Sequence, residues 1–146
     1  MERVCVSSII DAPADTVWQY VRDFNGMPEW HPAIHDSVIG DSRPGDAVGC
    51  VRHLHLTDGS ELREQLVALS DRARSQTYIL LESPLPITDY VATLRLLPVT
   101  DNDRSLAEWS AEFEVDPDQT EQVVTAIRED VFSTGLDGLK ALLERK

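Results

Sequence analysis

The chain has 146 residues, of which 42% are hydrophobic and 27% are charged, and its formal net charge is −13 at pH 7. These values are typical of one globular domain, and no apolar stretch reaches the roughly 18 residues that a membrane helix needs. Only 13 Lys and Arg residues oppose 26 acidic ones, so we expect no nucleic-acid partner and no membrane insertion. The first residues, MERVCVSSII, lack the pattern of a signal peptide, which favours a cytoplasmic location.

The first two predicted elements are a strand and a helix. Residues 3–10 are rich in Val and Ile, as is typical of a strand. In the following segment, DAPADTVWQYVRDF, a proline and an aspartate suit the first turn of a helix. The helical spacing places four apolar side chains on one face, which are Val17, Trp18, Val21 and Phe24. We therefore expect an amphipathic helix.

The rest of the chain predicts a meander followed by a long helix. Turn-forming segments separate runs of strand length at about 34–40, 47–56, 61–70, 75–82, 89–98 and 105–115. Consecutive strands with short links favour an antiparallel sheet. A helical apolar stripe then runs from Pro117 to near Glu144. The pattern predicts an α+β fold in one domain over residues 1–146, with a curved sheet of about seven strands wrapped around the C-terminal helix.

Two residue types leave questions open. Cys5 and Cys50 each lie in a predicted strand without metal or disulfide spacing, so we expect buried, reduced thiols. Gly135 and Gly138 interrupt the last helix, where each costs roughly 1 kcal/mol relative to Ala. They fit either a close approach to another element or room left for a bound molecule.

Strand parity brings charged side chains to the apolar face of the sheet. It places Arg52 beside Leu54 and Glu64 among leucines. A single buried charge costs several kcal/mol, so we expect these groups to be paired or hydrated. A mutual ion pair and a role facing a ligand both remain open. Small inward residues on later strands leave space for a cavity, namely Ala92, Ala107 and Ala111.

Four histidines invite a metal interpretation. His31 and His35 are close in sequence, and His53 and His55 share the outer face of their strand. Zinc, however, requires three or four ligands and oriented partners around them. The sequence alone favours ordinary surface histidines, so we predict no metal site and no cofactor.

Several segments together resemble a known superfamily. They are IDAPADTVWQYVRDF, WHP, GCVRHLHL, SPLPITDY, AEWSAEFE and GLDGLK, spread over essentially the whole chain. The chain is similar to the START-like helix-grip (SRPBCC) superfamily, in particular its polyketide cyclase/dehydratase-like bacterial branch. The resemblance implies an internal cavity that binds a small hydrophobic or aromatic molecule. Segments 57–59 and 84–88 fall where the plant abscisic acid receptors of this superfamily have their ligand-closing loops, but the first is shorter here, so hormone sensing is not implied. In the carrier or sensor hypothesis below, loops 57–60 and 84–89 close over the guest.

The expected site combines proton-transfer groups with pocket-lining side chains. His31 and Glu64 are the candidate catalytic residues, because an imidazole or a buried carboxyl can exchange protons near neutral pH. Glu82 would act similarly if it were buried. Trp30 is expected at the cavity mouth, while Trp109 is also a good core residue. The candidate ligand-binding residues are Trp30, Arg52, Leu54, Tyr78, Glu82, Tyr90, Trp109 and Phe132.

Three functional hypotheses follow. The first is a protein that binds a hydrophobic or aromatic molecule and acts as a cyclase or dehydratase on a polyketide-like substrate. The second is a carrier or sensor of such a molecule without catalysis. The third, least favoured, is an interaction module with a filled core. The sequence leaves a monomer and a homodimer equally open.

Overall fold

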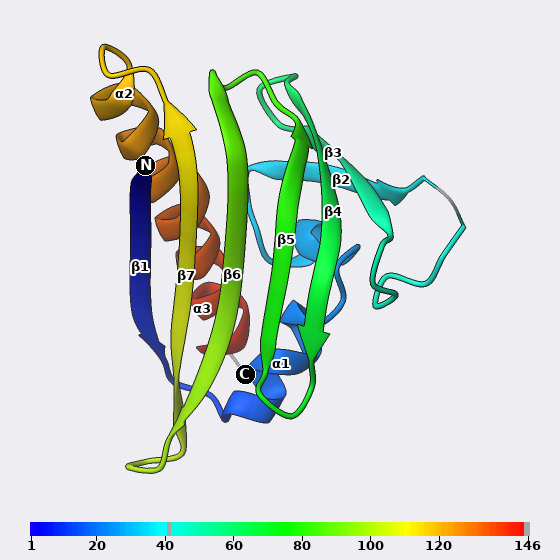
Figure 1. Ribbon diagram of the computed structural model, residues 1–146. Helices are drawn as coiled ribbons and strands as arrows, with labels where there is room; N and C mark the ends of the chain where they lie inside the picture. Colours follow the sequence, from blue (N-terminus) through cyan, green and yellow to red (C-terminus); the bar gives the residue numbers. More distant parts are fainter. Residues whose placement is uncertain (41, 145–146) are drawn as a thin grey trace.

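The structure, a computed structural model, describes residues 1–40 and 42–144. Its strands form one antiparallel sheet in the spatial order β1-β7-β6-β5-β4-β3-β2 (Figure 1). The strands are β1 (Glu2–Ile10), β2 (Ile34–Ile39), β3 (Val51–Leu56), β4 (Glu61–Ser70), β5 (Ser75–Glu82), β6 (Ile87–Val99) and β7 (Arg104–Val115). From β2 to β7 each strand pairs with the next, as the meander pattern predicts.

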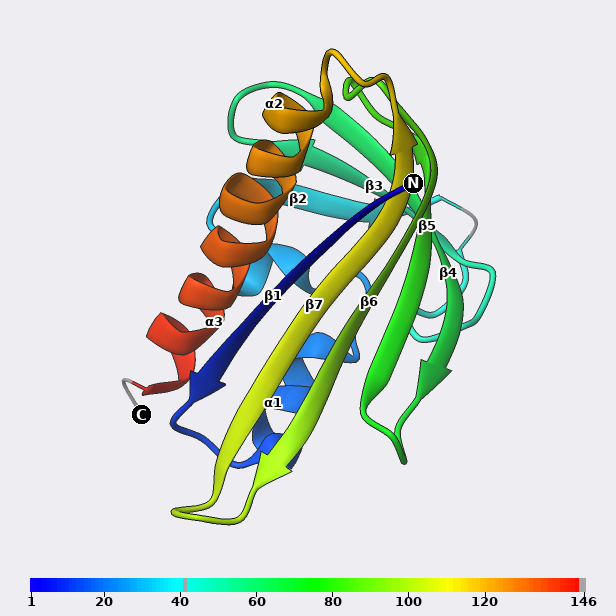
Figure 2. The same cartoon turned by 60° about the vertical axis from the view of Figure 1, so that its left-hand side comes forward.

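The helices lie on the concave side of this sheet. They are α1 (Ala14–Val21), the short 3-10 helix η1 (Met27–Glu29) and a C-terminal run of α2 (Thr120–Thr125), the π-helix η2 (Ala126–Ser133) and α3 (Thr134–Glu144). Figure 2 shows the sheet curving around the C-terminal run. The predicted helix-grip fold is therefore confirmed. None of the helices in the described residues is long and apolar enough to cross a membrane.

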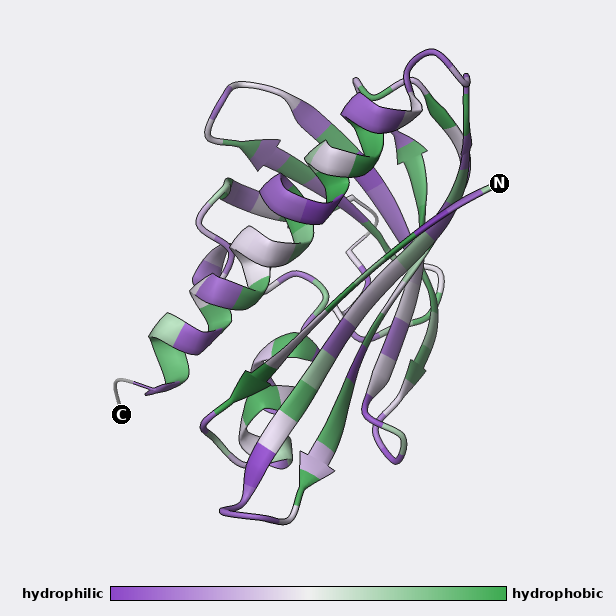
Figure 3. Ribbon diagram, turned by 90° about the vertical axis from the view of Figure 1, so that its left-hand side faces the viewer, coloured by the Kyte–Doolittle hydropathy of each residue, from purple (hydrophilic) through white to green (hydrophobic). Residues whose placement is uncertain are grey.

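The core lies between the inner face of the sheet and the helices. In β7 the predicted alternation holds, because Trp109 and Phe113 are buried while the intervening glutamates face outward. All four apolar residues of the first predicted helical face are also buried. Figure 3 shows the same division, with hydrophobic segments of the helices turned toward the sheet.

The C-terminal helical run differs from the continuous α-helix that the sequence predicts. It begins at Thr120, and its middle third is a π-helix. Two side chains bind carbonyls of that segment: Thr134 Oγ1 donates to the carbonyl of Glu129 at 2.8 Å, and His31 Nε2 donates to that of Val131 at 2.7 Å. These donors satisfy backbone groups where the α-helical pairing is altered. One of them comes from a distant part of the chain, so the helical pattern could not reveal it.

The two helix glycines allow close contact. A Cβ on Gly135 would lie 2.6 Å from the His31 ring and 2.7 Å from the Trp109 ring. A Cβ on Gly138 would lie 2.1 Å from the backbone oxygen of Trp30. Of the two interpretations left open, the structure supports the close approach of α3 to residues 30–32.

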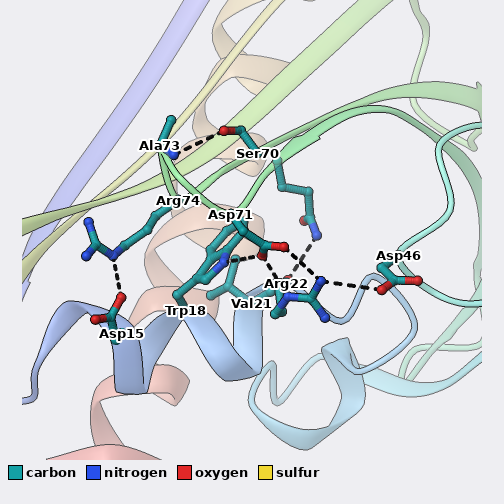
Figure 4. A network of polar contacts seen from close by, with 10 residues as sticks. Asp15, Trp18, Val21, Arg22, Asp46, Ser70, Asp71, Ala73 and Arg74 are labelled. Carbon is teal, nitrogen blue, oxygen red and sulfur yellow. Dashed lines mark hydrogen bonds and ion pairs between the residues drawn. The ribbon is translucent and has the colours of Figure 1, made fainter.

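Polar contacts hold α1 against the turn between β4 and β5 (Figure 4). Asp71 in that turn accepts hydrogen bonds from Trp18 Nε1 at 2.7 Å and Arg22 Nε at 2.8 Å. These bonds lower the pKa of Asp71, with Arg22 as the main cause. Arg74 pairs with Asp15 at 2.8 Å on the same side of the helix. These contacts fix α1 against the connection between β4 and β5.

Two expectations about the strands are wrong. Cys5 is exposed, because the parity of β1 puts its neighbour Val4 in the core instead; Cys50 is buried as expected. The strand predicted from residue 47 begins only at Val51. Gly49 adopts a φ of +98°, which a regular strand does not contain, and the chain turns there.

Candidate functional site

A buried ion pair lies at the centre of the concave face. Arg52 and Glu64 are direct cross-strand partners in β3 and β4, and only 2% and 5% of these residues are exposed. Arg52 Nε and Nη2 both donate to Glu64 Oε1, at 2.9 and 2.7 Å. Burial raises the pKa of Glu64, and the charge of Arg52 opposes that shift. Of the two interpretations left open, the structure contains the mutual pair.

Aromatic rings enclose the guanidinium of Arg52. Its central carbon lies 3.7 Å from the centre of the Phe24 ring and 4.9 Å from that of Tyr78. Arg52 Nη1 also donates to the carbonyl oxygen of Phe24 at 2.7 Å. Cation–π contact and three hydrogen bonds therefore hold this charge in a fixed place.

Two phenols extend the polar cluster toward the rest of the sheet. Trp109 Nε1 donates to the hydroxyl of Tyr78 at 3.0 Å. Burial raises the pKa of both Tyr78 and Tyr90, and the nearby charge of Glu64 adds to each shift. Both phenols therefore stay protonated at neutral pH and can act as hydrogen-bond donors.

His31 is held from both sides by backbone groups. Its Nε2 donates to the carbonyl of Val131, and its Nδ1 accepts the amide of Ala33 at 3.2 Å. Burial lowers its pKa from the usual 6.5 to about 4; the bond to Val131 opposes the shift and the charge of Arg52 adds to it. The imidazole is neutral at pH 7 with both nitrogens engaged. Its catalytic role stays a prediction, and its visible role is to bind α3 and η2 to the loop after η1.

Trp30 packs beside this histidine. It is 5% exposed, and its ring centre lies 5.7 Å from that of Trp109. In residues 1–40 and 42–144, its Nε1 is the one buried side-chain nitrogen or oxygen without a hydrogen-bond partner. Trp30 also borders a surface pocket of about 510 Å³ beside α3. The expected place at a cavity mouth stays a prediction.

A surface pocket lies where the two predicted closing loops meet. It measures about 650 Å³ and opens to solvent. Tyr90 reaches this pocket and is 6% exposed, and the same side chain influences the pKa of Tyr78 inside. Tyr90 thus separates the pocket from the buried cluster. The lining residues are Gly59, Ser60, Glu61, Leu80, Leu81, Glu82, Ser83, Pro84, Leu85, Ile87 and Tyr90.

The remaining predicted residues fall into two groups. Leu54 and Phe132 are buried, and Phe132 stacks on Trp109 with ring centres 4.6 Å apart. Glu82 is a candidate for proton transfer only if buried, and that condition is not met, because its side chain is 67% exposed and pairs with Arg63 at 2.8 Å. The last residue of β5 lies beyond the covered part of the sheet. Glu82 nevertheless borders the large pocket.

Phe24 is the residue of the cluster that the sequence did not identify. Its apolar character and its helical spacing predicted burial correctly. Its contact with Arg52 depends on how the chain leaves α1, since the backbone oxygen as well as the ring faces the guanidinium. No side-chain pattern signals a backbone acceptor.

Solved structures of other proteins share the fold of this chain. The protein XoxI from Bacillus cereus is 30% identical, with a TM-score of 0.88 over 99% of this chain and 96% of that one. The ZhuI aromatase/cyclase from Streptomyces sp. R1128 is 19% identical, with a TM-score of 0.80 over 99% and 94%. Norcoclaurine synthase from Thalictrum flavum, in complex with dopamine and hydroxybenzaldehyde, is 21% identical, with a TM-score of 0.79 over 99% and 88%.

The last two likenesses concern the fold alone. The family model for "polyketide cyclase / dehydrase and lipid transport" matches residues 1–144, which is nearly the whole chain. That match agrees with the superfamily to which the sequence motifs are similar. The chain belongs to the polyketide cyclase/dehydrase and lipid transport family.

Proposed function

We propose that this protein binds a small hydrophobic or aromatic molecule that enters through the 650 Å³ pocket and reaches the Arg52–Glu64 cluster past Tyr90. The observation that carries the proposal is the position of Tyr90, which borders the pocket and also interacts with Tyr78 within the cluster. In this proposal, rotation of the Tyr90 phenol exposes the buried cluster to the pocket. Ligand sites of this kind combine apolar walls with a few fixed polar groups.

The chemistry of the cluster indicates the kind of ligand. Arg52 and two protonated phenols offer hydrogen-bond donors, and the rings of Phe24 and Trp109 offer aromatic contact. A ring-bearing molecule with carbonyl or hydroxyl oxygens fits these groups better than a saturated chain does. The family and its aromatase/cyclase neighbour support the same class.

Thermal unfolding with a panel of probes tests the proposal. We would use a flavonoid, an anthraquinone, a medium-chain fatty acid and a sterol at equal concentration. A probe at about 100 times its Kd stabilises the folded state by about 2.7 kcal/mol. We expect the flavonoid or the anthraquinone to raise Tm most, and a flat response to all four would contradict the proposal.

Matched variants locate the binding site. Leu81 lines the pocket, whereas Val38 on β2 does not, and both are exposed apolar strand residues. We expect L81D to weaken the binding of the best probe by tenfold or more and V38D to leave it unchanged. Equal effects of both substitutions would place the ligand elsewhere.

Cyclisation with loss of water is a second candidate, favoured by one detail of the ion pair. Both Arg52 bonds go to Oε1 of Glu64, so Arg52 does not occupy Oε2. A carboxylate beside a protonated phenol can take a proton from carbon while Tyr78 donates one to a leaving hydroxyl; a C=C bond forms as water departs. After the water departs, Glu64 is protonated and Tyr78 is a phenolate, so a proton must return from Glu64 to Tyr78 before the next turnover.

A turnover assay distinguishes an enzyme from a carrier that only binds the ligand. If the protein is a cyclase or dehydratase, E64Q will still bind the probe but lose turnover of a linear poly-β-ketone substrate. H31Q tests the predicted role of His31 in the same assay. A carrier shows binding without turnover in the unaltered protein as well.

A further inference from the structure

A second polar cluster lies on the convex, outer face of the sheet, away from the pocket cluster. His53 and His55 project from β3 on the face opposite Arg52, and Glu61 begins β4. Asp36 on β2 and Glu61 on β4 are the cross-strand partners of His55, one on each side. Three adjacent strands therefore place Asp36, His55 and Glu61 in one cross-strand row, and His53 lies two residues from His55 along β3.

The nitrogen and oxygen atoms of this cluster converge. His53 Nε2 lies 3.2 Å from Glu61 Oε1, and His55 Nε2 lies 2.9 Å from the same oxygen. The imidazole rings stack with centres 4.7 Å apart, and each ring has one nitrogen close to the Glu61 carboxylate. One potential ligand atom from each of the three residues lies within 4.8 Å of the other two.

Two of these three separations are close to those around a bound zinc ion. Zinc bonds to imidazole nitrogen and carboxylate oxygen are about 2.0–2.1 Å long, so two ligands of a tetrahedral ion lie roughly 3.3 Å apart. The two imidazole–carboxylate distances, 3.2 and 2.9 Å, are close to that value. The side chains are 40–56% exposed, which leaves a fourth position open to water.

Asp36 supplies the outer partner that such sites use. His55 Nδ1 hydrogen-bonds to Asp36 Oδ1, on the ring nitrogen opposite the one that faces Glu61. A carboxylate on the far nitrogen of a metal-binding histidine fixes the ring orientation and directs the other nitrogen to the ion.

We propose that His53, His55 and Glu61 form a binding site for one Zn²⁺ ion, with Asp36 as the residue that orients His55. The sequence showed only the two histidines, because Glu61 and Asp36 join them through strand register. None of these three residues belongs to the Arg52–Glu64 cluster, which lies on the other face of the sheet. Glu61 also lines the 650 Å³ pocket, so the zinc site adjoins the proposed ligand entrance.

Zinc titration of the untagged, EDTA-treated full chain by calorimetry tests this proposal. We expect saturable binding of one Zn²⁺ per chain. H53Q and H55Q should each weaken binding by tenfold or more, and D36N by about tenfold, in line with the loss of an outer partner. His35 is exposed and outside the cluster, so H35Q is the matched control and should leave binding unchanged.

Cobalt gives an independent readout of the coordination. Co²⁺ bound with four ligands absorbs visible light far more strongly than hexahydrated Co²⁺, so we expect colour in the unaltered chain and in H35Q but not in H53Q or H55Q. Far-UV circular dichroism confirms that each variant is folded. Binding that fails to saturate at one equivalent, or that survives either H53Q or H55Q, would mean that the cluster is only a set of ion pairs and would overturn the proposal.

Discussion

Arg52 and Glu64 are both charged in a buried setting, and each depends on the other. Removing one partner leaves an uncompensated charge, which costs about 3–5 kcal/mol in comparable buried pairs. We therefore expect R52M to lower the free energy of unfolding by an amount of this order, measured by urea denaturation. E64Q also leaves a charge uncompensated, that of Arg52, so it should be destabilising as well, although its amide oxygen can still accept one hydrogen bond from Arg52.

The double variant R52M/E64L is the control for this prediction. With both charges removed, no buried group is left unpaired, so the double variant should be more stable than R52M alone. A double variant that is less stable than R52M would show that the two side chains do not act as a pair.

His31 gives a prediction about pH. The unfolded chain binds a proton near pH 6.5, whereas the folded protein binds it only near pH 4. The free energy of unfolding should therefore fall by about 3 kcal/mol as the pH drops from 6.5 to 4, and the contribution is complete above 6.5. The carboxylates also titrate in H31Q, so the difference between the two proteins isolates this histidine. If the two pH curves run parallel, His31 is not buried as a neutral base.

For single residues, the sequence predicted which face of a strand a side chain occupies better than it predicted which group that side chain contacts. Strand parity correctly turned Arg52 and Glu64 inward and His53 outward. The same reasoning could not say that His31 would bind the carbonyl of Val131, since the two residues are 100 positions apart and the acceptor is backbone. It also left open whether Glu82 is buried, because burial at a strand end depends on what covers it.

Among the elements, α3 is the one most constrained by its neighbours. A Gly-to-Ala change in a helix interior normally stabilises by roughly 1 kcal/mol. At Gly138 the added Cβ would meet the backbone of Trp30, which cannot move aside as a side chain can. We expect G138A to destabilise the protein by about 1–3 kcal/mol or more, measured by chemical denaturation.

Gly40 provides the comparison for that substitution. An added Cβ there meets nothing within 4 Å, so G40A should change the free energy of unfolding little. Should G138A prove as stable as G40A, α3 does not approach residues 30–32 as closely as described.

The elements themselves were largely predictable, for a local reason. Strand alternation and turn residues lie within a few positions of one another, so a meander leaves its pattern in the sequence. The π-helix left none, because its altered pairing is supported by Thr134 and by a histidine from another segment. The late start of β3 reflects the backbone conformation of Gly49.

For the whole molecule, the net charge of −13 should influence stability. Like charges repel in the compact state, and salt screens that repulsion over about 10 Å at 0.1 M. Exposed ion pairs each contribute only about 0–1 kcal/mol, so their loss in salt is the smaller effect. We expect Tm to rise between low-salt buffer and the same buffer with sodium chloride added, as followed by calorimetry. A lower Tm in salt would mean that local pairs such as Arg22–Asp71 outweigh the overall repulsion.

The overall fold could be predicted from the order of the strands and helices in the sequence, whereas the candidate site could be predicted only in part. The helix-grip arrangement follows from one strand, one helix, six strands and a last helix. The position of Tyr90 between the pocket and the cluster depends on the curvature of the sheet and on loop shapes, which have no simple sequence pattern.

The pairing of β1 with β7 has a consequence for synthesis of the chain on the ribosome. Strand β1 ends at Ile10, but its only sheet neighbour begins at Arg104. At about 5–20 residues per second, the nascent chain must wait roughly 5–20 s before that partner exists. During this time the strands from β2 to β6 can already form hairpins, while β1 has no sheet partner. Its backbone edge therefore stays open to pairing with other chains until β7 has been made.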